Sequence, residues 1–217
     1  GMCLVNCPFG AIVDKGQIFQ TIHAMKSGKE VIAAIAPAFV GQFGASVTPE
    51  KVKGALKALG FADVVEVAIG ADLCTVEEAE DFLNKVPEQQ PFMATSCCPA
   101  WSVMAKKLFP DFKPYISMAL TPMVLTGRLI KKQKPDAKVV FIGPCAAKKL
   151  EASRKSVRSD IDFVLTFEEV MGMFEAKGIV LEQAMVDEPF AEGTANGRGF
   201  AVSGGVANAV KQCIQKE

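Results

Sequence analysis

Two cysteine motifs hold the side chains of this sequence that are best suited to chemistry. The doublet Cys97-Cys98 lies in TSCCPAW at residues 95–101, and Cys145 lies in GPCAAKK at residues 143–149. Each motif follows an apolar run that predicts a strand and precedes a predicted helix, and open α/β sheets bind ligands at the carboxyl ends of their strands. Cys98 and Cys145 are therefore candidates for a metal ligand or a nucleophile. The alternative is that these cysteines pack as small apolar side chains.

Two other groups of residues could support such a site. Lys148 lies one helical turn after Cys145 and Glu151 one turn later, so a lysine could stabilise a thiolate there. The simpler interpretation is an i, i+3 salt bridge on a solvent-exposed helix face. Cys3 and Cys7 form C-x3-C-P, the tail of the bacterial ferredoxin run of cysteines. Only the last two cysteines of that run are present, so we expect no intact cluster at this pair.

Predicted strands and helices alternate along the chain. A threonine, proline or glycine marks most helix ends, and capping boxes are predicted at Thr75–Glu78 and Thr166–Glu169. The pattern predicts an α/β fold with mostly parallel sheet flanked by helices, in two lobes that divide within residues 110–137. The strands are expected at residues 31–36, 64–69, 92–95, 138–142, 162–165 and 199–202, and the helices at residues 49–59, 75–86, 99–109, 117–132, 167–177 and 205–215.

The composition argues against several kinds of partner and location. Lys and Arg number 24 and Asp and Glu number 24, with no basic stripe, so nothing indicates nucleic acid or an anionic membrane. The uncharged run at residues 31–49 is interrupted by prolines and glycines, so we predict no membrane span. The seven unevenly spaced cysteines indicate a reduced, cytoplasmic protein. Hydrophobic residues make up 50% of the chain, which predicts some exposed apolar surface.

TSCCPAW and GPCAAKKLE resemble the first two signature motifs of the catalytic domain of FeFe (iron-only) hydrogenases. The ferredoxin tail lies where that family carries an accessory 4Fe-4S domain. The resemblance implies a remnant of this 4Fe-4S segment at residues 1–20, a first lobe at residues 21–135 and a second lobe at residues 136–217, with the active-site cleft between the lobes. Other similar segments are Ala36-Pro37-Ala38, Gly70-Ala71-Asp72-Leu73, Thr121-Pro122-Met123 and Ser203-Gly204-Gly205-Val206.

The resemblance implies a cofactor and a role for each motif residue. The family's active site is the H-cluster, a 4Fe-4S cubane joined through a cysteine to a di-iron unit with carbon monoxide and cyanide ligands. By motif match, Cys98 and Cys145 would be two of the four cubane ligands, and Cys97 would be the thiol that delivers protons. The remaining matches are Lys148, which would hydrogen-bond a cyanide, and Ala36 and Pro37, which would contact the diatomic ligands.

A proton path is also implied by the resemblance. It would run outward from Cys97 through Glu78 and Ser117 and, less directly, Asp81. Glu78 and Asp81 are one helical turn apart, which suits a relay between acid and base groups. The competing interpretation of Glu78 is the capping box with Thr75.

Two departures from the family pattern bear on activity. Gly143 stands where the family usually has a methionine that packs near the di-iron unit, which favours a divergent or sensory subgroup over high turnover. The family's third motif, a C-x3-C that follows the second motif, would supply the other two cubane ligands, and residues 146–217 contain only the single Cys213. We therefore expect a fragment that is inactive and holds no metal. The single residues Cys74, Cys213 and His23 are expected to be structural.

Two functional hypotheses remain, and they belong to different classes. In the first, the parent protein interconverts protons plus electrons with dihydrogen and exchanges electrons with ferredoxin or a partner redox subunit. In the second, it is a hydrogenase-like sensor of redox state or hydrogen, or an iron-sulfur assembly protein, with little or no turnover. Gly143 favours the second hypothesis, whereas Cys97 opposes its assembly version. A nucleotide-binding domain is poorly supported, because Val202 stands where a dinucleotide fingerprint requires glycine.

Overall fold

The computed structural model describes residues 5–13 and 15–216, and its centre is one parallel sheet. The strand order is β2-β1-β3-β4, and each neighbouring pair is parallel. Every residue of β1 is buried, as a continuous apolar run predicts for a central parallel strand. The predicted α/β fold is confirmed. The strands are β1 (Val31–Ile35), β2 (Asp63–Glu66), β3 (Lys138–Gly143) and β4 (Phe163–Thr166).

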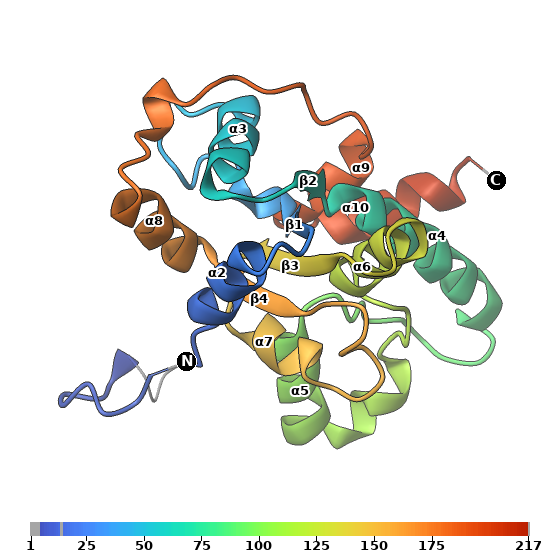
Figure 1. The fold of residues 1–217 in the computed structure, drawn as a ribbon. Helices are drawn as coiled ribbons and strands as arrows, with labels where there is room; N and C mark the ends of the chain where they lie inside the picture. The colour runs from blue at the N-terminus through green and yellow to red at the C-terminus, as the bar shows by residue number, and fades with distance from the viewer. Residues whose placement is uncertain (1–4, 14, 217) are drawn as a thin grey trace.

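Helices cover both faces of this sheet (Figure 1). Helices α3 (Pro49–Leu59) and α8 (Phe167–Ala176) lie together on one side, whereas α4 (Ala68–Lys85), α6 (Pro122–Gln133) and α10 (Gly205–Ile214) gather on the other. The two-sided cover explains why the central strands β1 and β3 are almost entirely apolar. The shorter elements are α2 (Ile18–Lys26), η1 (Pro37–Phe39), α5 (Pro99–Leu108), η2 (Pro110–Tyr115), α7 (Ala147–Ala152), η3 (Leu181–Gln183), α9 (Ala195–Arg198) and η4 (Gly199–Ala201).

Local sequence signals account for the ends of two helices. The Thr48 side chain accepts a hydrogen bond from the Lys51 N–H at the start of α3, and Gly60 ends that helix with a φ of 118°. Such a left-handed residue strongly favours glycine. At α8, Thr166 and Glu169 form both hydrogen bonds of the predicted capping box. These two predictions are confirmed.

The predicted capping box at Thr75–Glu78 is wrong. Helix α4 begins at Ala68, directly after β2, so Ile69 is helical rather than part of a strand. Thr75 lies inside this helix, and its hydroxyl donates to the Ala71 carbonyl at 2.8 Å. Threonine and glutamate three residues apart also suit a helix interior when the hydroxyl bonds back to the preceding turn, and the sequence pattern alone could not separate these cases.

Three further predicted elements differ in the structure. Residues 92–95 form no strand of the sheet and contribute only an isolated bridge between Ala94 and Ile116. The helix expected at residues 117–132 begins at Pro122, because a proline suits the first helical turn and the preceding residues form a loop. Residues 199–201 form the short helix η4 instead of a strand.

Strands from both predicted lobes join the same sheet. Strands β1 and β2 lie within residues 21–135, whereas β3 and β4 lie within residues 136–217. Strand β1 pairs with β3 from Val31↔Lys138 to Ile35↔Ile142. Backbone hydrogen bonds therefore connect the two segments at the centre of the fold, and their division into lobes stays a prediction.

The surface carries the exposed apolar side chains that the composition predicts. Trp101, Leu108 and Phe109 on and after α5 are 40%, 66% and 52% exposed. Within the described residues, no helix combines the length and apolar character needed to cross a bilayer.

Asp162 connects α6 and β3 to the start of β4. Its carboxylate accepts hydrogen bonds from Lys131 at 2.8 Å, from Lys138 at 2.6 Å and from the Val139 N–H at 2.9 Å. Burial by itself would raise the pKa of Asp162, but these donors outweigh it and hold the pKa below its usual range. The ionised carboxylate is therefore the form that stabilises the fold.

Replacing this carboxylate tests its contribution to stability. Asp162→Asn should lower the free energy of unfolding by about 1–3 kcal/mol at pH 7, because charged hydrogen bonds are lost. A lowered pKa means that the stabilisation is present above about pH 4 and is lost as the pH falls further, so variant and wild type should converge in acid. Urea denaturation at several pH values measures both effects.

The matched control is Glu30→Gln, which removes an exposed ion pair with Lys134 in which both side chains are 44% exposed. This variant should change the free energy of unfolding by less than about 1 kcal/mol. Equal losses in the two variants, or a loss in Asp162→Asn that does not depend on pH, would contradict the assigned role of Asp162.

Candidate cofactor site

The candidate site is a cavity of about 230 Å³ at the carboxyl ends of β1 and β3. The chain runs from β1 to β2 in one direction along the sheet and from β3 to β4 in the other, so β1 and β3 flank the point where the strand order reverses. Ligands of doubly wound sheets bind at such a point. Residues predicted from the sequence that line this cavity are Ala36, Pro37, Cys97, Cys98, Cys145 and Lys148.

Helix starts position the two cysteines expected to bind metal. Cys98 is the N-cap of α5, and Pro99 occupies the first turn. Cys145 lies just before α7, and its Sγ accepts a hydrogen bond from the Ala147 N–H at 3.4 Å. Both thiols are exposed. Both cysteines therefore lie at a helix start with their side chains accessible from the cavity.

Lys148 connects the two cysteine motifs. Its Nζ donates to the Cys97 carbonyl at 3.0 Å and to Glu151 Oε2 at 2.7 Å. Glu151 Oε1 also accepts a hydrogen bond from the Thr121 hydroxyl at 2.8 Å. The Lys148 and Glu151 side chains are only 14% and 5% exposed. The expected i, i+3 salt bridge therefore exists, but the prediction that it lies on a solvent-exposed face is wrong.

Cys97 differs from Cys98 in its surroundings. Its side chain is half-buried and lines the cavity, whereas the Cys98 side chain is exposed. Burial raises the pKa of the Cys97 thiol, the charge of Glu78 raises it further, and Lys148 opposes the shift. In the metal-free chain Cys97 is therefore a protonated thiol at neutral pH.

Glu78 is a fully buried acid in the middle of α4. Neither carboxylate oxygen has a hydrogen-bond partner of ordinary geometry among the described residues. Burial raises its pKa to about 7, although the nearby Ser96 N–H and Ser117 hydroxyl lower it in part. Glu78 can therefore gain or lose a proton near neutral pH, which a helix-capping glutamate would not do.

The other two residues of the predicted proton path lie away from the cavity lining. Ser117 is buried in the loop before α6, where its Oγ accepts a hydrogen bond from the Ala119 N–H at 3.1 Å. Asp81 follows Glu78 by one turn, is 30% exposed and forms an ion pair with Lys85 at 2.9 Å. The structure brings Glu78 and Ser117 together and places Asp81 toward solvent.

The ferredoxin-like cysteines are separate from this cavity. Cys3 lies outside the described residues. Cys7 belongs to residues 5–13, which extend away from the sheet (Figure 1). The backbone N–H groups of Phe9 and Ala11 lower the pKa of Cys7, as suits a thiolate.

The donor set of the cavity fits part of an iron-sulfur ligand set. Thiolates are the usual ligands of iron-sulfur clusters, and a 4Fe-4S cluster takes four. Cys98 and Cys145 are exposed at the cavity, so their side chains are of the right type for two of the four positions. Across the part of the chain that the structure describes, no three His, Cys, Asp or Glu side chains are grouped so that they could hold a metal ion.

Sequence reasoning missed several apolar residues of the cavity wall. Phe141 comes from β3, Met123 from the start of α6, and Phe200 and Ala201 from η4. Phe141 lies two residues before the end of its strand, a position that could have been selected, whereas no sequence pattern distinguished Phe200. Cys74 is buried inside α4, as expected for a packing residue.

Comparisons with known proteins agree with this geometry. Residues 29–217 match the family described as iron only hydrogenase large subunit, C-terminal domain. The chain is 33% identical to iron hydrogenase 1 of Clostridium pasteurianum in an alignment of 227 positions that covers 93% of this chain and 39% of the relative. A solved [FeFe]-hydrogenase from Chlamydomonas reinhardtii superposes with a TM-score of 0.77 and 27% identity, covering 92% of this chain and 57% of that one.

The chain is also similar to proteins whose names indicate a role in iron-sulfur cluster assembly. The chain is 34% identical over 164 residues to a probable cytosolic Fe-S cluster assembly factor of Aedes aegypti, covering 67% of this chain and 34% of the relative. The fold and site define an α/β protein with a cysteine-lined cavity at the switch point of its parallel sheet. With the family match, this chain belongs to the iron-only hydrogenase large-subunit family. It spans less than half the length of either curated relative named here.

The raised pKa of Glu78 predicts an unusual pH dependence of stability. A carboxyl whose pKa rises from 4.5 to about 7 on folding keeps its proton up to a higher pH in the folded state than in the unfolded chain. The free energy of unfolding should therefore fall by about 2–3 kcal/mol between pH 5 and pH 8. Glu78→Gln should remove this fall, so that the variant is more stable than wild type at pH 8. Urea denaturation at both pH values measures the effect.

Glu77→Gln provides the matched control, because Glu77 is the exposed neighbour on the same helix. This variant should follow the wild-type pH profile. If Glu78→Gln instead loses as much stability as wild type between the two pH values, the assigned protonation of Glu78 is wrong.

Proposed function

We propose that the parent protein is an FeFe hydrogenase that interconverts protons plus electrons with dihydrogen. One observation carries this proposal. The six motif residues that line the cavity come from three separate segments, at residues 36–37, 97–98 and 145–148, and meet at the switch point of the sheet. This convergence supports a single cofactor pocket. Membership of the hydrogenase family supports the reaction class.

The proposed roles follow from where each side chain lies. Cys98 and Cys145 would hold the 4Fe-4S part of the H-cluster through their thiolates, which are exposed at the cavity. When bound, the H-cluster supplies the redox chemistry of protons, electrons and dihydrogen. Lys148 would donate a hydrogen bond to an anionic ligand of that group. Ala36 and Pro37 would form an apolar wall that excludes water from it.

Proton transfer is assigned to Cys97, Glu78, Ser117 and Asp81. Cys97 lines the cavity, Glu78 and Ser117 are buried behind it, and Asp81 reaches the solvent side of α4. This order from cavity to surface supports a relay in which Cys97 holds the proton at its Sγ and Glu78 exchanges it. Lys148 contributes by fixing the Cys97 carbonyl, and therefore the position of the thiol.

A second candidate function has specific support. A Cβ built at Gly143 would lie 2.3 Å from Cε1 of Phe141, so the Phe141 ring covers the place that the family's usual methionine would need. The wall of the pocket therefore differs from the common pattern. The similarity to an iron-sulfur assembly factor points the same way. The second candidate is a hydrogenase-like sensor of redox state or hydrogen, or an assembly protein, with little turnover.

The proposal for the whole protein includes partners and a location. An accessory 4Fe-4S cluster bound in part by Cys3 and Cys7 would pass electrons between the H-cluster and ferredoxin or a partner redox subunit. We propose a cytoplasmic location, because the described cysteines are free thiols, as is usual for cytosolic proteins.

Replacing Cys97 in the matured, full-length protein tests the first candidate. Cys97→Ala should lower the rate of hydrogen evolution by at least about 100-fold, the usual contribution of a positioned acid or base. The iron content should stay at the wild-type level, because Cys97 is not assigned as a ligand. Hydrogen evolution with a chemical reductant and iron analysis provide the two measurements.

Cys213→Ala is the control, since Cys213 lies late in α10 and does not line the cavity. It should leave the rate unchanged. An undiminished rate in Cys97→Ala would show that Cys97 does not deliver protons. A wild-type protein that holds its full iron content but evolves no hydrogen would favour the second candidate.

A further inference from the structure

One wall of the cysteine cavity is formed by a segment far from the motifs in sequence. Phe200 and Ala201 line the same cavity as Cys97. They end a stretch at residues 193–201, here called the strap, which contains α9 and η4 and packs against α4. The strap follows a long connection without a sheet strand and leads into α10, which also packs against α4.

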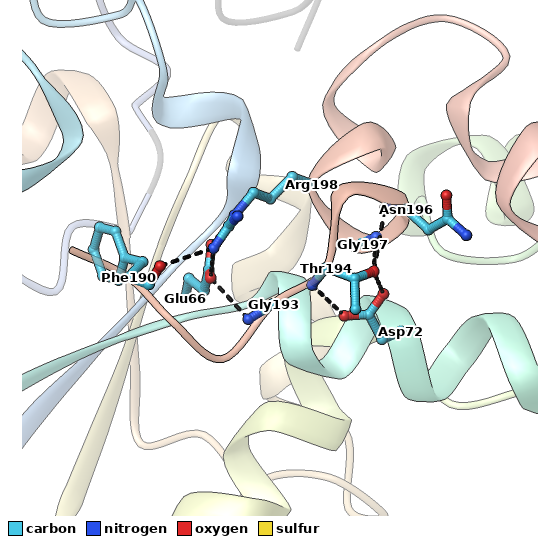
Figure 2. Close-up of polar contacts among 8 residues, drawn as sticks. All are labelled: Glu66, Asp72, Phe190, Gly193, Thr194, Asn196, Gly197 and Arg198. Atoms are coloured by element: carbon cyan, nitrogen blue, oxygen red, sulfur yellow. Dashed lines mark hydrogen bonds and ion pairs between the residues drawn. The ribbon is translucent and has the colours of Figure 1, made fainter.

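A buried carboxylate holds the strap at one point. Glu66, at the end of β2, is 2% exposed. Arg198 Nε donates to Glu66 Oε2 at 2.9 Å, and a second guanidinium nitrogen donates to Oε1, which makes the pair bidentate (Figure 2). Glu66 Oε1 also accepts the Gly193 N–H at 2.8 Å. Both oxygens of the buried acid are therefore satisfied by the strap, as a buried charge requires.

A second carboxylate holds the strap one helical turn along α4. Asp72 Oδ2 accepts a hydrogen bond from the Thr194 N–H at 2.8 Å, and Oδ1 accepts one from the Thr194 hydroxyl (Figure 2). The same hydroxyl accepts the N–H of Asn196 at 3.2 Å, at the start of α9. Asp72 therefore also fixes the helix that leads to Phe200.

Two glycines allow the strap to approach α4 closely. A Cβ at Gly193 would lie 2.4 Å from Cβ of Ala68, and a Cβ at Gly197 would lie 2.2 Å from the Ala68 carbonyl oxygen. Neither gap could hold a side chain without moving the backbone. At Gly199, two residues nearer to Phe200, a Cβ would meet nothing within 4 Å. The close approach is therefore specific to the contact with α4.

We propose that Glu66, Asp72 and Arg198 are positioning residues that hold the strap in place, so that Phe200 closes one wall of the cavity that Cys97 also lines. The inference rests on the proposed function only in treating this cavity as the cofactor pocket. An apolar wall at this position limits the access of water and small reagents to the Cys97 thiol. Opening the strap would expose that thiol while the sheet stays folded.

Alkylation of the metal-free chain of residues 1–217 tests this inference without any cofactor. The rate at which iodoacetamide modifies each cysteine is measured by mass spectrometry of the peptides, with Cys7 as the internal reference. Arg198→Met should raise the rate of modification at Cys97 relative to Cys7 by about 5- to 30-fold. Loss of the Glu66–Arg198 pair should increase the population with an open strap by this factor. Gly197→Ala should do the same without removing a charge.

Matched controls exist for both variants. Gly199→Ala adds the same methyl group where space is open. Arg128→Met removes an arginine of similar exposure, 45% against 46%, whose partner is Asp160 instead of Glu66. Neither control should change the relative rate at Cys97. Cys74 is buried inside α4 and should stay unreactive in every variant, which shows that the fold persists.

Two results would overturn the inference. In the first, Arg198→Met and Gly197→Ala leave the relative rate at Cys97 at the level of their controls. In the second, Cys74 gains reactivity in parallel with Cys97, which would mean that these contacts hold the whole fold and not the cavity wall. Since the assay needs no iron, either result is independent of whether the parent protein acts on hydrogen.

Discussion

The parallel pairing of β1 with β3 is the constraint on which the rest of the structure depends. Its last pair, Ile35↔Ile142, leaves Ala36 and Gly143 side by side, and the Ala36 N–H donates to the Ile142 carbonyl at 2.8 Å. Residues separated by more than a hundred positions therefore leave the sheet at one edge. Since β2 and β4 lie on opposite outer sides of this pair, the two chain segments diverge there and leave room for a ligand.

Buried polar side chains close to the cysteine motifs determine the chemistry of the site. Lys148, from the second cysteine motif, donates hydrogen bonds to the Cys97 carbonyl of the first motif and to Glu151, and the Thr121 hydroxyl donates to the same Glu151 carboxylate. Cys97 and Glu78 are shielded from water, which raises the pKa of each. Cys98 and Cys145 remain exposed. The two halves of the doublet therefore differ in environment although they are neighbours in sequence.

The sequence predicted the parts of this arrangement that local rules decide. Continuous apolar runs located β1 and β3, and Thr48, Gly60 and the Thr166–Glu169 box located helix ends. The sequence prediction was wrong at Thr75 in α4, because the same residue pattern suits both a helix start and a helix interior. It could not predict contacts such as Glu66 with Arg198, because no local rule couples residues 132 positions apart. The lining residue Phe200 was missed for the same reason, whereas Phe141 lies near the end of β3 and could have been selected from its place in the strand.

We infer that in the matured, full-length protein the cysteine cavity holds the di-iron group as well as a cubane. Infrared spectroscopy of that protein is the direct test. Wild type should show stretching bands of bound carbon monoxide and cyanide, and Cys145→Ala should lose them. Cys213→Ala should give the same bands as wild type. Absence of these bands in wild type, under conditions that mature a known hydrogenase, would contradict the claim. Persistence of the bands in Cys145→Ala would show that the site lies elsewhere.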